Sequence, residues 1–166
     1  MRLFLLAACI VPAAAAAQNL PFSPAETESC LLGVEGNARL DCVGKSAQAC
    51  IDTPDGYTTA GMSFCLGFER DYWDARLNAA YWPLMALEEQ SDAELTELGS
   101  AAPKSAPALR DMQRAWIAFR DSACFYEVTQ WGGGTGAGPA SANCEMIQTA
   151  RQALALEDRL AQRTAQ

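Results

Sequence analysis

Apolar residues recur at helical spacing along most of the chain beyond residue 58. They fall every three or four positions, which is the spacing of residues on one face of an α-helix. The first such face predicts a long helix that Thr58 or Thr59 could cap, with Pro83 expected to kink it or end its regular part. The residues that trace this face are Met62, Cys65, Leu66, Glu69, Tyr72, Trp73, Leu77, Ala80, Tyr81, Leu84 and Leu87.

Two further helices are predicted after a connector rich in Gly, Ser, Ala and Pro. One opens at Pro107, runs to about residue 128 and should bury the stripe Leu109, Met112, Trp116, Phe119 and Ala123. The glycines of residues 132–138 then break the pattern. A last helix covers about residues 140–161, with Met146, Ile147, Ala150, Leu154 and Leu160 facing inward.

These patterns predict an all-α protein, an antiparallel bundle of three long helices of about 20 residues each. Residues 18–58 lack a sustained period and are rich in Cys, Gly, Pro and Ser. They predict a loop-rich segment held by disulfides, with one short helix near residues 26–32. The chain therefore divides into a leader (1–17), this Cys-rich segment (18–58) and a helical domain (59–166).

The first residues have the pattern of a secretory signal peptide. Arg2 precedes a short apolar run and a series of small residues that ends at Ala17, where cleavage is expected. The alternative is a lipid-attachment box with Cys9 as the acylated residue. No later stretch approaches the roughly 20 apolar residues of a membrane helix. We therefore expect a periplasmic or secreted protein without a membrane span.

Six cysteines remain after the leader, an even number that favours three disulfides in an oxidising compartment. The favoured arrangement joins Cys124 to Cys144 across the glycine-rich segment and pairs the other four among themselves. Zinc is the alternative for such a cluster, but the chain has no Cys-x-x-Cys pair and no histidine. The six residues are Cys30, Cys42, Cys50, Cys65, Cys124 and Cys144.

Acidic residues outnumber basic ones. Removing the leader takes away Arg2 and leaves 11 basic against 20 acidic side chains. This balance disfavours nucleic acid and anionic lipid as partners and would attract a cationic protein, although solubility alone also explains it. One run has five carboxylates and no base, and we call it the acidic shoulder. Its residues are Glu88, Glu89, Asp92, Glu94 and Glu97.

Catalytic motifs are scarce. The absence of histidine excludes Ser-His-Asp and Cys-His pairs as well as histidine-ligated metals. The glycine run lacks the Gly-Lys-Ser/Thr ending of a phosphate loop. Glu69 with Asp71 or Asp74, beside Trp73, could form the carboxylate pair of a glycoside hydrolase. Trp73 lies on the apolar face, however, so we expect a core residue and predict no enzyme, cofactor or metal.

The segment around Trp116 combines aromatic, charged and cysteine residues. Trp116 is expected to anchor the core, whereas Trp131 beside the glycines should be partly exposed. Arg120 is interpreted as structural. Because Arg120 and Asp121 are neighbours in sequence, they should point in different directions on a helix and find other partners.

Several of these residues together resemble the LprI-type lysozyme-inhibitor family over about residues 50–160. The most specific part is Trp-x-x-Phe-Arg-Asp-x-x-Cys, carried by Trp116, Phe119, Arg120, Asp121 and Cys124. Leu77, Asn78 and Tyr81 form a second segment, and these motif residues are interpreted as fold residues. Cys30 and Cys42 depart from the plainer family pattern.

The resemblance implies a small helical envelope protein that inhibits lysozyme. Lysozymes of the host type are basic, so the acidic shoulder is the candidate surface for binding one or another cationic protein. The alternative function is a non-inhibitory structural or adaptor module of the bacterial envelope.

Overall fold

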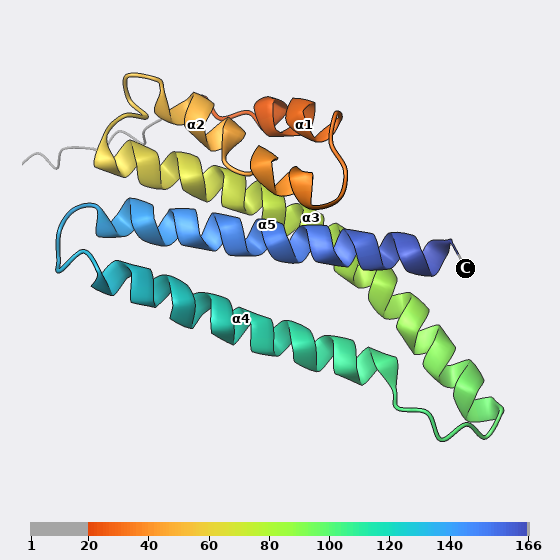
Figure 1. Cartoon of the computed structure of the whole chain (residues 1–166). Coiled ribbons are helices and arrows are strands. Elements are labelled where there is room, and N and C mark those ends of the chain that lie inside the picture. Colours follow the sequence, from red (N-terminus) through yellow and green to blue (C-terminus); the bar gives the residue numbers. More distant parts are fainter. Residues whose placement is uncertain (1–19, 166) are drawn as a thin grey trace, which may run out of the picture.

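The computed structural model describes residues 20–165, all of whose regular structure is helical (Figure 1). The predicted all-α class is confirmed. The predicted signal sequence and Cys9 lie outside the described residues. The elements, in order, are α1 (Ala25–Leu31), the 3-10 helix η1 (Gly36–Cys42), α2 (Lys45–Ile51), α3 (Thr59–Glu97), α4 (Ser105–Thr129) and α5 (Ala137–Thr164).

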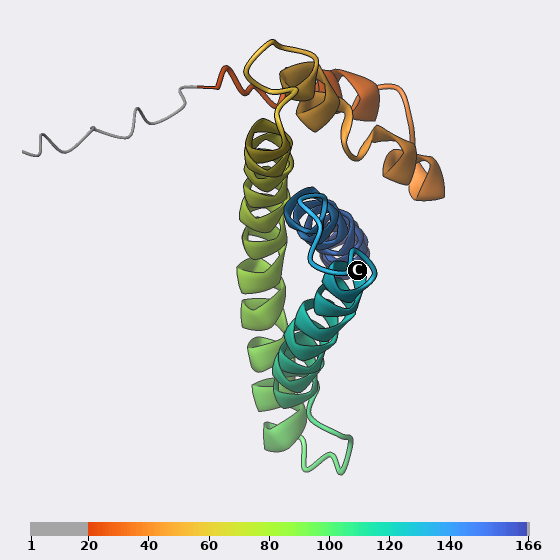
Figure 2. The same cartoon turned by 90° about the vertical axis from the view of Figure 1, so that its left-hand side faces the viewer.

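The three long helices form a bundle in which consecutive helices are antiparallel, so α5 packs along α3 in the same direction and α4 packs mainly on α5 in the opposite one (Figures 1 and 2). The three short helices form a cap over the N-terminal half of α3. Apolar side chains from α3 and α5 supply most of the core, among them Trp73, Leu77, Leu84, Met146 and Leu154. Within residues 20–165, none of the helices combines the length and the apolar character that a membrane crossing needs.

α3 has 39 residues and continues ten residues beyond Leu87, the last residue of the predicted apolar face. Thr58 is its N-cap, because its side-chain oxygen accepts a hydrogen bond from the Gly61 amide at 2.9 Å. The helix bends near its middle but continues through Pro83 (Figure 1). Leu84 and Met85, directly after the proline, are buried. Packing of this face therefore outweighs the hydrogen bond that proline removes.

The N-terminal segment contains more helix than predicted. Three helices of seven residues replace the expected loop with a single short helix. Elements this short leave no readable period in the sequence. The Cys30–Cys42 disulfide closes this cap, and the Cys50–Cys65 disulfide joins it to α3.

The third disulfide, Cys124–Cys144, joins α4 to α5 across the glycine-rich connection, as predicted. All six cysteines of residues 20–165 are bridged, so none of them is a thiolate ligand, and no cluster of metal-binding side chains occurs in this part of the chain.

Candidate functional site

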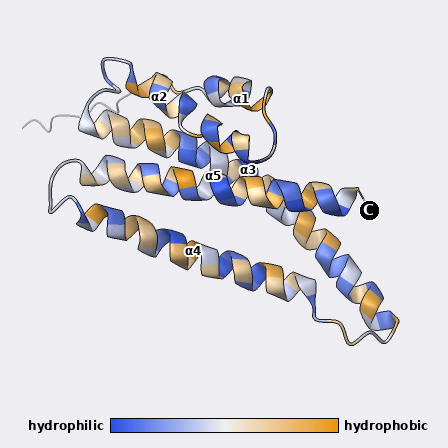
Figure 3. Ribbon diagram, viewed as in Figure 1, coloured by the Kyte–Doolittle hydropathy of each residue, from blue (hydrophilic) through white to orange (hydrophobic). Residues whose placement is uncertain are grey.

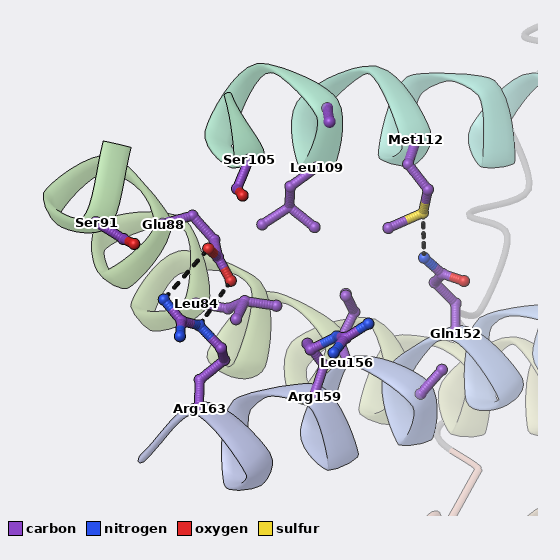
Figure 4. Close-up of a pocket in the computed structure, with 12 residues that line it drawn as sticks. Leu84, Glu88, Ser91, Ser105, Leu109, Met112, Gln152, Leu156, Arg159 and Arg163 are labelled. Carbon is purple, nitrogen blue, oxygen red and sulfur yellow. Dashed lines mark hydrogen bonds and ion pairs between the residues drawn. The ribbon is translucent and has the colours of Figure 1, made fainter. Parts of the chain in front are cut away.

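A groove of about 700 Å³ lies where α3, α4 and α5 meet (Figure 4). Its apolar lining comes from one leucine on each helix, Leu84, Leu109 and Leu156, and from Met112 on α4. Gln152 on α5 reaches across to α4, where its amide donates to Gln113 Oε1 at 2.9 Å. The groove therefore offers apolar contacts with a few polar groups along its edges.

An ion pair closes one end of this groove. The Arg163 guanidinium contacts the Glu88 carboxylate with an Nε–Oε1 distance of 3.0 Å, and both side chains are largely buried (Figure 4). Arg159 lines the groove nearby and reaches solvent. No second carboxylate lines the groove, so its lining lacks the paired carboxylates that glycoside hydrolysis requires.

Asp92 of the acidic shoulder caps α4 and has little contact with solvent. Its carboxylate accepts hydrogen bonds from the Ser105 amide at 2.8 Å and the Ala106 amide at 2.9 Å. These two amides, assisted by Lys104, lower the pKa of Asp92 below its ordinary value. Asp92 therefore holds the α3–α4 connection, a role that the acidic run in the sequence did not reveal.

The other shoulder residues differ in how far they reach into solvent. Glu88 is committed to the ion pair at the groove, and Glu89 makes an exposed contact with Arg110 at 3.4 Å. Glu94 and Glu97 are exposed on the last turns of α3. The five carboxylates therefore do not form one surface, and Glu89, Glu94 and Glu97 are the three that a partner could touch.

Glu69 is fully buried between α3 and the cap. Its carboxylate accepts four hydrogen bonds, from the Thr27 hydroxyl, the Gly44 and Ala47 amides and the Trp73 indole, at 2.6 to 3.1 Å. Substrate cannot reach this group, and the candidate hydrolase pair is therefore wrong. Trp73 is a core residue, as expected. The sequence did contain one sign of this buried role, because Glu69 is a carboxylate on an otherwise apolar face of the predicted helix.

The family-motif residues divide between core and surface. Leu77 and Tyr81 are buried, whereas Trp116 packs at the edge of the core without being enclosed. Asn78 is exposed and donates only to Asp74, at 2.9 Å. Phe119 is 59% exposed. Burial is consistent with a role in the fold for Leu77 and Tyr81, and a fold role for the exposed motif residues stays a prediction.

Arg120 and Asp121 pair with each other, contrary to the expectation that they would find separate partners. The distance from Arg120 Nη2 to Asp121 Oδ1 is 2.8 Å. The long arginine side chain folds back along the helix, with its guanidinium 5.0 Å from the centre of the Trp116 ring. The pair thus covers one side of Trp116.

The predicted apolar stripe of α4 is only partly covered. Leu109, Trp116 and Ala123 are half-buried, but Met112 is 42% and Phe119 59% exposed. The helix instead turns Ala106, Gln113 and Cys124 toward the bundle. The disulfide at Cys124 and the cap at Asp92 fix this orientation, and neither could be read from the apolar pattern.

Trp131 is 51% exposed, in agreement with the sequence-based expectation. Its ring lies directly against Gly136, where an added Cβ would come within 2.0 Å of the ring. The glycine-rich connection therefore includes a specific contact in addition to its flexible composition.

Fold and site together define a small helical protein, cross-linked by three disulfides, with an apolar groove among its long helices. The chain belongs to the lysozyme inhibitor LprI family, because its residues 50–156 match the sequence model of that family. This match confirms the resemblance seen in the sequence. It covers the Cys50–Cys65 and Cys124–Cys144 disulfides and leaves Cys30–Cys42 outside.

Two curated relatives carry no assigned activity. An uncharacterized 17.7 kDa protein in the puhA 5′ region of Rhodobacter capsulatus is 30% identical over 155 residues, 92% of each chain. An uncharacterized protein of Rhizobium meliloti (strain 1021) is 33% identical over 63 residues, 38% of this chain and 45% of its own length. No solved structure matches.

Proposed function

We propose that this protein is an exported, non-catalytic binding protein that inhibits lysozyme or a similar cationic protein. Membership of the lysozyme inhibitor LprI family is the observation that carries the proposal. Three disulfides are consistent with an oxidising, periplasmic or secreted location.

The distribution of charge supports a cationic partner. Helix α3 has eight carboxylates and only two arginines, whereas α4 has three carboxylates and three arginines. A basic partner approaching in solution is therefore attracted toward α3, and such steering raises the rate of association more than it lowers the rate of dissociation.

Within α3 we assign the contact to the exposed carboxylates Glu89, Glu94 and Glu97. Glu88 and Asp92 act indirectly, because their ion pair and cap set the position of the last turns of α3 against α4 and α5. Of the five residues of the acidic shoulder, three are thus assigned to contact with the partner and two to support of the helix that carries them.

Changing Glu89, Glu94 and Glu97 together to glutamine is expected to slow association with lysozyme several-fold at low salt. The physical reason is the loss of three exposed negative charges, and added salt should shrink the difference because it screens them. Stopped-flow or surface-binding kinetics at two salt concentrations measure the effect.

A matched control removes three exposed carboxylates of the cap, Glu26, Glu28 and Glu35, also by glutamine. These residues precede the segment that the family description matches. We expect a smaller change in the association rate. Equal slowing by the two triple variants would mean that only total charge matters, and no change in either would remove the acidic contact from the proposal.

The second candidate function is the non-inhibitory structural or adaptor module. This second function is favoured by the contacts of Glu88 and Asp92, since their carboxylates bind Arg163 and the Ser105 amide within the protein. A specific envelope partner recovered in pull-down experiments, with lysozyme activity unaffected, would support this function instead.

A further inference from the structure

We propose that two copies of this protein pair through the exposed face of α4, with the two α4 helices antiparallel. This inference concerns self-association and is independent of the proposed binding of lysozyme. The face that carries it, which we call the outer stripe, consists of Ala108, Met112, Ala115, Phe119, Ser122 and Tyr126.

The outer stripe has the spacing of a helix that packs on another helix. Its residues alternate by four and three positions, the repeat of a coiled-coil seam, over about 27 Å of helix. All six are exposed, with Met112 at 42%, Phe119 at 59% and Tyr126 at 63%. At 100° per residue, the centre of the stripe lies roughly 150° around the helix from Ala106, Gln113 and Cys124, which face the bundle. Two residues of the stripe, Ala108 and Met112, also border the groove among the long helices, where Met112 Sδ accepts a hydrogen bond from Gln152 at 3.3 Å. The bundle leaves the rest of the seam, Ala115, Phe119, Ser122 and Tyr126, exposed to solvent.

The sizes of the side chains favour an antiparallel pair of two identical α4 helices over a parallel pair. Small residues occupy every seventh position, Ala108, Ala115 and Ser122, and large residues occupy Met112, Phe119 and Tyr126 between them. In an antiparallel pair, each core layer combines one position of each kind, so a large side chain meets a small one. A parallel pair would instead set large against large and small against small.

This alternation also sets the register. When Ala108 lies opposite Tyr126 of the second copy, Ala115 lies opposite Phe119 and Met112 opposite Ser122. The two-fold axis then passes near residue 117, and Phe119 lies close to the centre of the interface.

Charge favours a second copy over a cationic protein at this face. α4 has equal numbers of arginines and carboxylates, while the chain as a whole is strongly acidic. The excess of negative charge lies on the cap and on α3. Pairing through α4 therefore brings neutral surfaces together, whereas a basic partner gains more at α3.

The exposed apolar area indicates a weak, reversible dimer. Met112, Phe119, Tyr126 and the neighbouring Phe125 are each between 42% and 68% exposed, and Figure 3 shows apolar residues toward the C-terminal end of α4. At roughly 200 Å² for a large side chain, they amount to about 900 Å² for two copies. That is below the ~1,600 Å² of a standard interface, so we expect a dissociation constant in the micromolar range.

Sedimentation velocity of the mature protein over a wide concentration range tests the pairing. The unaltered protein should pass from monomer to dimer, and Phe119→Asp should raise the dissociation constant more than tenfold. Phe64→Asp is the matched control, because Phe64 is 52% exposed on α3, away from the outer stripe, and its change should have little effect. A monomer at every concentration, or equal weakening by both variants, would overturn the proposal.

The orientation is tested with single introduced cysteines. Ala118→Cys, beside the two-fold axis, should form a covalent dimer under mild oxidation. Ala108→Cys should not, since the two copies of residue 108 would lie about 27 Å apart along the helices. The opposite result would indicate a parallel pair and overturn the proposal. So would a Phe119→Asp protein that loses lysozyme binding while its self-association is unchanged.

Discussion

Replacing Glu69 with leucine is expected to lower the free energy of unfolding by about 4 kcal/mol, because several buried donors lose their acceptor together. The Thr27 hydroxyl, the Gly44 and Ala47 amides and the Trp73 indole all donate to this carboxylate. An unsatisfied buried group costs roughly 1–3 kcal/mol, and water entering the site would offset part of the sum. The cap should also lose its fixed position on α3, to which the Cys50–Cys65 disulfide still tethers it.

Urea unfolding followed by circular dichroism measures this loss, and hydrogen exchange at the Ala47 amide reports the cap separately. Glu69→Gln keeps one acceptor oxygen and should cost about half as much. Glu28→Ala removes an exposed carboxylate of the cap and should change stability by less than about 0.5 kcal/mol. A Glu69→Leu protein as stable as the Glu28→Ala protein would show that Glu69 does not hold the cap.

Removing the Cys124–Cys144 disulfide, by changing both residues to alanine, is expected to cost about 3 kcal/mol of unfolding free energy. The disulfide closes a segment with a sequence separation of 20 residues, and a cross-link of this length removes about that much chain entropy from the unfolded state. The loss should also loosen α4 at its C-terminal end, where the disulfide ties it to α5.

The matched comparison removes Cys30–Cys42, which closes a 12-residue separation within the cap. Its removal should increase amide exchange in α1 and η1 and leave exchange in α4 and α5 unchanged. If the two double variants had the same effect on exchange in α4, the Cys124–Cys144 disulfide would not be what positions that helix.

The long helices could be predicted because each buries a face over many turns. The apolar period located α4 and α5 within a few residues, and Thr58 was recognisable as a cap. Pro83 did not show where α3 ends, because the local sequence cannot reveal that packing on both sides of the proline lets the helix continue. The helices of the cap were too short for periodicity and depend on disulfides and on Glu69.

The candidate site was predictable only in part. An acidic run is visible in the sequence. Contacts with residues distant along the chain determine which of its carboxylates form helix caps and ion pairs and which stay exposed. Asp92 accepts hydrogen bonds from the Ser105 and Ala106 amides, and Glu88 forms an ion pair with Arg163. The groove has the same origin, because its lining comes from three helices that only the tertiary structure brings together.

Inhibition of lysozyme by this acidic, cross-linked helical protein is measured by the rate at which lysozyme clears cell-wall substrate in the presence of the purified mature protein. At low salt we predict inhibition that increases with concentration and saturates, and that becomes weaker at moderate salt. Unchanged lysozyme activity at both salt concentrations, with the protein in large excess, would show that this protein does not inhibit lysozyme.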